Sequence, residues 1–107
     1  MSRKNITGEE GEFLGWFDSS CCKAVFEEDT YFNGHNQISK ATGSQWIHET
    51  LYLTAKETWV IGRSGNYKDT YFKISRTQAA RWLMQNDHDD NKNIPADIAE
   101  IMNSHEM

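Results

Sequence analysis

The sequence predicts an α+β fold in which a small antiparallel sheet of three to four strands is followed by two C-terminal helices. Residues 24–32 and 45–54 alternate between apolar and polar side chains, as half-buried strands do. Residues 76–86 repeat their apolar side chains at the helical spacing and follow a capping sequence. Because residues 45–84 hold most of the large apolar side chains, we expect them to form the centre of the fold.

The composition favours a single globular domain. The chain has 107 residues, 37% hydrophobic and 12% aromatic, which suffices for one core. Its apolar runs are far shorter than the ~20 residues that span a bilayer, and its N-terminus is polar, so we expect a cytoplasmic protein without membrane contact. We expect a mobile polar arm at 1–11, a core domain at 12–86, and an acidic linker with a helix packed on the same domain at 87–107.

The N-terminal half supplies an anchor and a strand. Residues 12–17, EFLGWF, form an aromatic cluster that should tie the arm to the core. The strand over residues 24–32 has an acidic outer face and ends at the strong turn signal Asn33–Gly34. Residues 35–44 contain little to bury except Ile38, so we expect a surface loop there.

The strand over residues 45–54 has two different faces. One face is aliphatic except for Glu49, a carboxylate that is costly to bury unless it is paired. Arg63 on the next strand is the expected partner, which favours a structural ion pair over a catalytic acid or base. The other face is either an aromatic, half-polar binding surface or a second core layer beneath a helix. It carries Trp46, His48, Thr50 and Tyr52.

Two further strands and a helix follow. Strands over residues 58–62 and 70–74 complete the predicted sheet. Ser75 and Gln78 match the capping box S-x-x-Q, which begins a helix over residues 76–86. The predicted buried face of this helix comprises Ala79, Ala80, Leu83 and Met84, with Trp82 at its edge.

A second helix is expected over residues 95–104. Pro95 suits the first helical position, and the following residues supply a narrow apolar stripe of Ile98, Ile101 and Met102. We expect residues 87–93 to form a polar linker between the two helices.

No cofactor and no metal is expected. Cys21 and Cys22 are adjacent, which rarely satisfies disulfide geometry, and no further cysteine completes a metal shell. The four histidines lack ligand spacing, and neither a phosphate-binding loop nor a nucleophile elbow occurs. A general acid–base enzyme or a metal-independent nuclease would use the central strands, with the candidates His48, Glu49, Tyr52 and Arg63.

Charge is unevenly distributed along the chain. The net charge is −5, and the residues from Gln85 onward account for all of it. Residues 40–81 carry seven basic against three acidic side chains, an excess of +4. This excess favours a basic patch for an acidic partner or a nucleic acid, formed by Lys68, Lys73, Arg76 and Arg81. The acidic segments 27–29 and 87–90 are either solvated surface or mimics of a nucleic acid.

A longer pattern runs through the middle of the chain. Asn36–Thr54 reads N-x-I-S-x-x-T-G-S-Q-W-x-H-E-x-L-Y-x-T, and W-V-I, Y-x-x-I-S and A-x-x-W-L-x-x-N follow within Trp59–Asn86. Over roughly positions 13–86 this pattern resembles that of small uncharacterised proteins encoded by bacteria, their plasmids and their phages. The resemblance implies no established activity. Where the pattern prefers Gly this chain has Glu57, which resists positive φ, so the turn there departs from the pattern.

These features predict a binding regulator of mobile-element origin. It would bind a host or cognate protein stoichiometrically, as an anti-CRISPR-like inhibitor or an antitoxin-like partner. The alternatives are a nucleic-acid-binding protein that uses the basic patch and an enzyme at His48 and Glu49. An outer strand at the edge of the sheet also offers a place to pair with a second copy of the chain.

Overall fold

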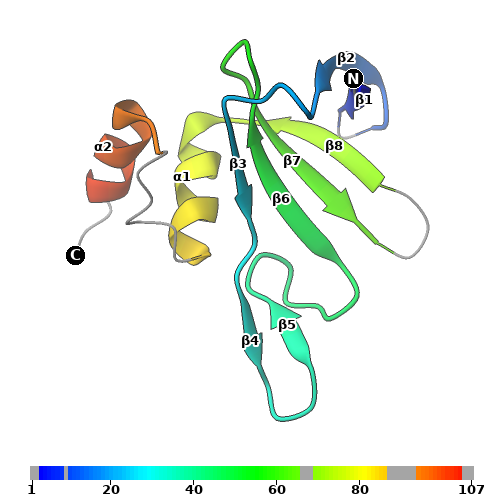
Figure 1. The fold of residues 1–107 in the computed structure, drawn as a ribbon, viewed down its shortest axis with the longest axis vertical. Coiled ribbons are helices and arrows are strands. Elements are labelled where there is room, and N and C mark those ends of the chain that lie inside the picture. The colour runs from blue at the N-terminus through cyan, green and yellow to red at the C-terminus, as the bar shows by residue number, and fades with distance from the viewer. Residues whose placement is uncertain (1–2, 9, 66–68, 87–93, 105–107) are drawn as a thin grey trace.

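The computed structural model describes residues 3–8, 10–65, 69–86 and 94–104. Within these residues, eight strands precede two helices (Figure 1). The strands are β1 (Arg3–Thr7), β2 (Phe13–Asp18), β3 (Ala24–Glu27), β4 (Thr30–Phe32), β5 (Gln37–Ser39), β6 (His48–Leu53), β7 (Trp59–Ser64) and β8 (Asp69–Ile74). The helices are α1 (Arg76–Gln85) and α2 (Ala96–Ser104).

The main sheet is larger than the sequence predicts. Its six strands follow the order β2-β1-β8-β7-β6-β3, while β4 and β5 pair in a separate two-stranded sheet. Neighbouring strands are antiparallel except β1 and β8, which run parallel. The predicted fold class, an antiparallel sheet of three to four strands, is therefore wrong: the sheet is mixed and six-stranded, and a second sheet accompanies it.

The additional strands of the main sheet come from the N-terminal residues. β1, RKNIT, lies within the expected polar arm and buries only Ile6. β2 lies within the expected aromatic cluster and buries Phe17. Because β1 has a single apolar side chain, backbone pairing with β2 and β8 stabilises it, and its sequence carries no alternation that would predict a strand.

The predicted strand over residues 24–32 consists of two separate strands. β3 ends at Glu27 and β4 begins at Thr30, so that Glu28 and Asp29 interrupt the run. The interruption lets the chain leave the main sheet and pair with β5. β5 itself lies in the expected surface loop, where it buries Ile38 and Ser39.

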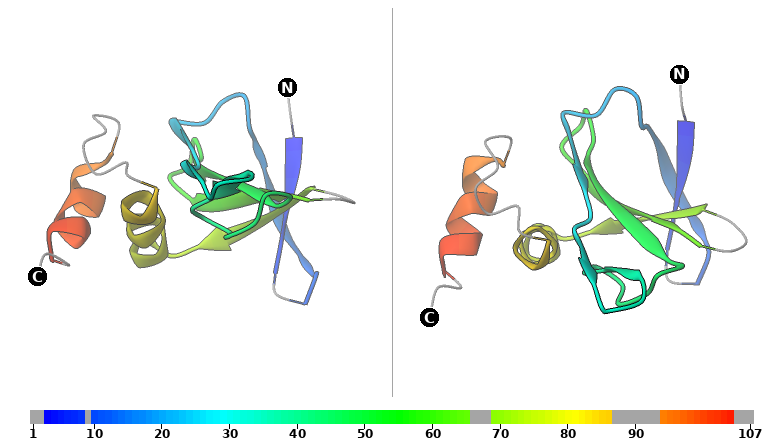
Figure 2. Two further views of the ribbon diagram at one scale, coloured as in Figure 1. Left: turned by 90° about the horizontal axis from the view of Figure 1, so that it is seen from below. Right: turned by 60° about the horizontal axis from the view of Figure 1, so that its bottom comes forward.

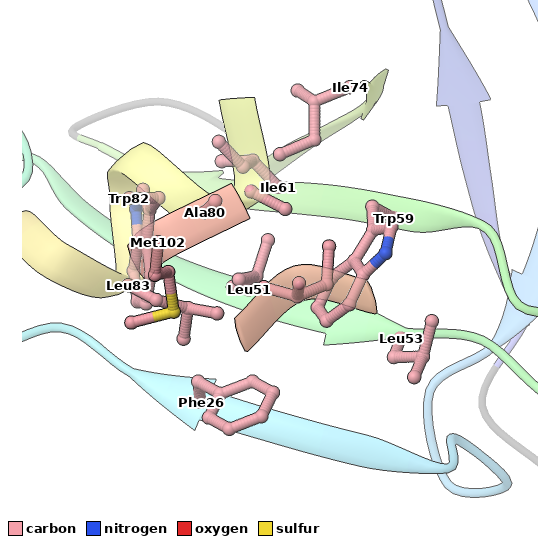
Figure 3. Packing of buried hydrophobic residues seen from close by; sticks show 12 residues of the cluster. Phe26, Leu51, Leu53, Trp59, Ile61, Ile74, Ala80, Trp82, Leu83 and Met102 are labelled. Atoms are coloured by element: carbon pink, nitrogen blue, oxygen red, sulfur yellow. The ribbon is translucent and has the colours of Figure 1, made fainter. Parts of the chain in front are cut away.

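The main hydrophobic core lies between the helices and one face of the sheet (Figure 3). Leu51 of β6, Leu83 of α1 and Ile98 of α2 are fully buried in it. Burial of an aliphatic side chain of this size contributes about 1.5–3 kcal/mol. The other members of the core include Phe26, Leu53, Trp59, Ile61, Ile74, Ala79, Ala80, Trp82 and Met102.

Both predicted helices form, and the start of α1 confirms the capping box. The Gln78 N–H donates to the Ser75 Oγ at 3.1 Å, and the Ser75 N–H donates to the Gln78 side chain at 2.9 Å. Trp82, expected at the edge of the helix face, is only 4% exposed. α1 lies next to the sheet and α2 beyond it (Figures 1 and 2). Neither helix of the described chain is long and apolar enough to cross a membrane.

The β1–β2 hairpin runs across the opposite face of the sheet (Figure 2). Ile6 and Phe17 pack there on Val60, with Tyr52 and Tyr71 partly buried beside them. The Phe17 ring centroid lies 5.2 Å from that of Tyr52 and 5.7 Å from that of Tyr71. This second cluster of side chains is therefore covered by a hairpin, whereas the sequence predicted either an open surface or a covering helix.

Candidate functional site

β6 carries four of the ten predicted site residues, and its alternation distributes them over both faces of the sheet. Glu49 faces the helices and is 5% exposed. His48, Thr50 and Tyr52 occupy the opposite face, as the alternation predicts. Trp46 precedes the strand and is 65% exposed.

Glu49 is the buried acceptor of an ion pair whose other member, Arg63, is half-exposed. Arg63 lies directly opposite it on β7, and the guanidinium Nε and Nη2 donate to the Glu49 Oε2 at 2.9 and 2.6 Å. The indole Nε1 of Trp82 donates to the Glu49 Oε1 at 3.1 Å. The expected partner, Arg63, is therefore confirmed. Because both oxygens of this carboxylate hold donors, its charge is compensated within the core.

The four residues of the hypothetical enzyme do not share one site. Glu49 and Arg63 meet on the helix side of the sheet, whereas His48 lies on the other face. Tyr52 is separated from His48 by four strand positions, a distance of ~13 Å, and packs in the second cluster. The geometry offers a structural role for Glu49 and does not assemble an acid–base pair from these side chains.

Tyr52 and Tyr71 are shielded from water within the second cluster. Burial raises the pKa of the Tyr52 phenol above its ordinary value, and the neighbouring Tyr71 raises it further. Burial, followed by the charge of Asp69, likewise raises the pKa of Tyr71. Both phenols consequently stay neutral at ordinary pH, and Tyr52 is not an open contact residue of the predicted binding face.

Glu28 is a polar anchor that was not among the site residues predicted from the sequence. Its side chain is 10% exposed and lies between the end of β3 and the start of β6. The Oε1 accepts from the Ser39 Oγ at 2.9 Å and from the Glu49 N–H, while the Oε2 lies 2.6 Å from the His48 Nδ1. The only signal in the sequence was a carboxylate on the apolar side of the alternating run 24–32.

Further contacts attach the β4–β5 sheet to the rest of the molecule. The Asp29 N–H donates to the side chain of Asn86, a 2%-exposed residue that caps α1. The Lys40 N–H donates to the Asp29 carbonyl at 2.9 Å, and its Nζ lies 2.8 Å from the Asp29 carboxylate. Together with Glu28, these contacts hold the small sheet in one orientation.

The attached segment presents large apolar side chains to solvent. β4 and β5 project beyond one end of the main sheet (Figure 1). Tyr31 and Phe32 of β4 are 48% and 64% exposed. Trp46 and Ile47, in the turn that leads from the small sheet into β6, are 65% and 38% exposed. We call these four residues the hairpin aromatic group, after the β4–β5 hairpin on which or beside which they lie. Ile47 is its aliphatic member.

The predicted basic residues are dispersed. Lys73 lies in register with Val60, on the sheet face away from the helices. Arg76 donates from its Nη1 to Asp97 at 3.2 Å, which compensates its charge. Arg81, five positions further along α1, points about 140° away around the helix. Lys68 lies outside the described residues. No single basic patch unites the three described side chains.

The cysteines form neither a disulfide nor a metal site. Cys21 is an exposed free thiol and Cys22 a partly buried one. Burial, followed by the charges of Asp18 and Cys21, raises the pKa of Cys22, so this thiol is a poor nucleophile. Across the described ranges, no group of three or more His, Cys, Asp or Glu side chains is placed to hold a metal ion. Comparison of the chain with protein-family models, with curated proteins and with solved structures gives no match.

Proposed function

We propose that the protein acts by stoichiometric binding to another protein through the hairpin aromatic group. One observation carries this proposal: Tyr31, Phe32 and Trp46 expose half to two thirds of their area on a segment anchored by Glu28 and Asn86. An exposed aromatic side chain of this kind leaves on the order of 100 Å² in water. Its burial in an interface contributes about 2–3 kcal/mol.

Anchoring the segment favours binding. A surface that is already held in one orientation loses less conformational entropy on association than a mobile loop does. Trp and Tyr are also the residue types that most often dominate interface energies. In keeping with the resemblance to small proteins of bacteria, plasmids and phages, the partner is a host or cognate protein, and the role is that of an inhibitor or an antitoxin-like partner.

The test has two stages. First, the tagged wild-type protein is used to capture proteins from the cells in which the gene resides, and the captured protein is identified by mass spectrometry. Second, the purified partner is titrated calorimetrically with wild type and variants. We expect 1:1 binding that Trp46→Ala or Phe32→Glu weakens at least 30-fold, which corresponds to about 2 kcal/mol at a hot spot.

Phe13→Glu provides the matched control. Phe13 and Phe32 are both 64% exposed strand residues, but Phe13 lies on β2, outside the hairpin aromatic group. The control should bind the partner as wild type does. The proposal is contradicted if Trp46→Ala and Phe32→Glu bind the partner with the affinity of the wild type. It is also contradicted if no captured protein binds again when it is purified.

A further inference from the structure

β2 is the edge strand of the main sheet. It pairs with β1 on one side, and no strand of the described chain pairs with its other side. The β1–β2 hairpin lies at the end of the molecule opposite the two helices, so neither helix covers it (Figure 2). An edge of this kind presents backbone N–H and C=O groups that are able to pair with another strand.

β2 has an irregular register with β1 at Leu14, which lies between the paired residues Phe13 and Gly15, but it lacks the other usual protections of an edge strand. Its sequence, FLGWFD, contains neither lysine nor proline, the residues that most often block edge pairing. Phe13, Leu14 and Trp16 are 64%, 56% and 53% exposed. The other edge strand, β3, is shorter, with four residues, and exposes a single large apolar side chain, Val25.

We propose that β2 pairs antiparallel with β2 of a second copy of the chain, which joins two main sheets edge to edge. Identical strands related by a twofold axis perpendicular to the sheet are able to pair in this way, because the contact is isologous. The occupant of the edge is therefore the protein itself.

The charges at the two ends of β2 favour the antiparallel direction. Glu10 and Glu12 precede the strand, and the Glu12 carboxylate accepts from the Glu10 N–H at 3.2 Å. At the other end, Arg3 stacks over the Trp16 ring at 5.5 Å from its centroid, and Asp18 lies in register with Arg3. Lys56, on the turn between β6 and β7, lines the same cavity as Asp18 and adds a second positive charge at this end. Antiparallel pairing places the acidic end of each copy against the basic end of the other.

A cavity at the same edge provides room for side chains of the second copy. It measures about 440 Å³ and lies between the Phe17 end of β2 and the β6–β7 turn. Its apolar walls include Ile6, Trp16, Phe17 and Ala55. Because antiparallel pairing reverses the strand, the Phe13–Leu14 end of one copy lies beside the cavity of the other, and two equivalent cavities are filled at once.

The exposed area indicates the size of this contact. Phe13, Leu14 and Trp16 together offer on the order of 350 Å² per copy, about 700 Å² for the pair. The flanking charges and strand backbone bring the total to the ~1,000 Å² at which specific interfaces begin. An interface at this lower limit is typical of weak or transient association.

Sedimentation velocity over a concentration series tests the proposal with the full chain. We expect the wild type to shift from monomer to dimer, and Phe13→Glu to raise the Kd at least tenfold. Phe32→Glu, of equal exposure on β4, should leave the Kd unchanged. Circular dichroism and thermal unfolding check that both variants fold as wild type does.

A charge exchange keeps the test valid even if Phe13→Glu perturbs the hairpin. Lys56→Glu should weaken the dimer, and the double variant Glu12→Lys with Lys56→Glu should restore it. The proposal is overturned if the wild type is a monomer at every concentration, or if Phe32→Glu weakens the dimer as much as Phe13→Glu does. It is also overturned if no self-association occurs and Phe13→Glu instead weakens the binding of a different protein. Because the proposed function depends on Phe32 and this pairing on Phe13, each can fail while the other stands.

Discussion

One buried and one largely buried carboxylate show how single polar residues are satisfied in this protein. Glu49 accepts two hydrogen bonds from Arg63 and one from Trp82. Glu28 accepts from Ser39 and from the Glu49 N–H, and contacts His48 with its second oxygen. Removing either carboxylate leaves buried donors without partners, which costs more than the hydrogen bonds contribute.

Glu57 shows a conflict between one residue and its backbone. Its φ of 64° is the single positive φ of a non-glycine residue in the described ranges. The turn is closed by the Glu57 N–H, which donates to the Thr54 carbonyl at 2.9 Å. This conformation costs an L-residue about 1–2 kcal/mol. The ion pair with Lys23 at 2.9 Å joins side chains 50% and 71% exposed and offsets at most about 1 kcal/mol.

Replacement of Glu57 by Gly should therefore be tolerated although it removes an ion pair. We expect Glu57→Gly to be at least as stable as wild type and about 1 kcal/mol more stable than Glu57→Ala, because both lack the ion pair but only Gly relieves the positive φ. Urea unfolding at pH 7 measures the difference. An alanine variant as stable as the glycine variant would show that the turn relaxes without cost.

At the scale of elements, three neighbouring strands and the N-terminal hairpin meet around Gly62. This residue of β7 lies in register with Thr50 of β6 and Tyr71 of β8. A Cβ there would lie 2.8 Å from the Tyr71 Cε1 and 2.9 Å from the Tyr52 Cε2. The missing side chain lets the two rings close over the strand beneath Phe17, which is how the hairpin gains an apolar surface to cover.

Gly62→Ala should accordingly destabilise the protein by about 1–3 kcal/mol, since the rings and the hairpin above them must move. Gly65→Ala is the control: its Cβ would meet nothing nearer than the Ile47 Cγ1 at 3.9 Å, so a change within about 0.5 kcal/mol is expected. Chemical unfolding of both variants provides the comparison. Equal effects would mean that the Tyr52–Tyr71 packing does not constrain β7.

At the scale of the whole molecule, the sheet is covered on both faces by unlike elements. The helices cover one face, and the β1–β2 hairpin, whose strands bury only Ile6 and Phe17, covers the other. The second cluster is small, with Ile6, Phe17 and Val60 as its buried members, and it includes two tyrosines. The attachment of the hairpin therefore depends on phenols that remain neutral.

This dependence predicts a loss of stability at alkaline pH. The pKa values of Tyr52 and Tyr71 are raised in the folded protein, so the unfolded chain loses these protons first, near pH ~10. The free energy of unfolding should hold below that pH and fall as the pH rises through the folded pKa values. The free energy of unfolding of Tyr52→Phe should follow the same pH dependence as that of the wild type below pH ~9 and fall less above it. Urea unfolding at each pH measures both free energies, and the same pH dependence over the whole range would contradict this linkage.

The features that depend on a few neighbouring residues were predicted from the sequence. The capping box at Ser75 and Gln78, the helix it begins and the alternation of β6 follow from backbone geometry and side-chain spacing over a few residues. The partner of Glu49 was also predictable, because adjacent strands place Arg63 directly opposite. The division into arm, core domain and acidic C-terminal segment stays a prediction, as do the acidic residues 87–90, which lie outside the described ranges.

The sequence by itself thus determined the two helices, the central strands and the burial of Glu49 with Arg63. Only the tertiary structure decided that residues 3–7 become a strand and that the run 24–32 breaks at Glu28. It also decided that the aromatic side chains are divided between the face covered by the β1–β2 hairpin, the exposed β4–β5 hairpin and the open edge at β2. The reason is physical: each of these outcomes depends on contacts between segments distant in the chain. A spacing pattern describes how one segment distributes its side chains, not which other segment pairs with it.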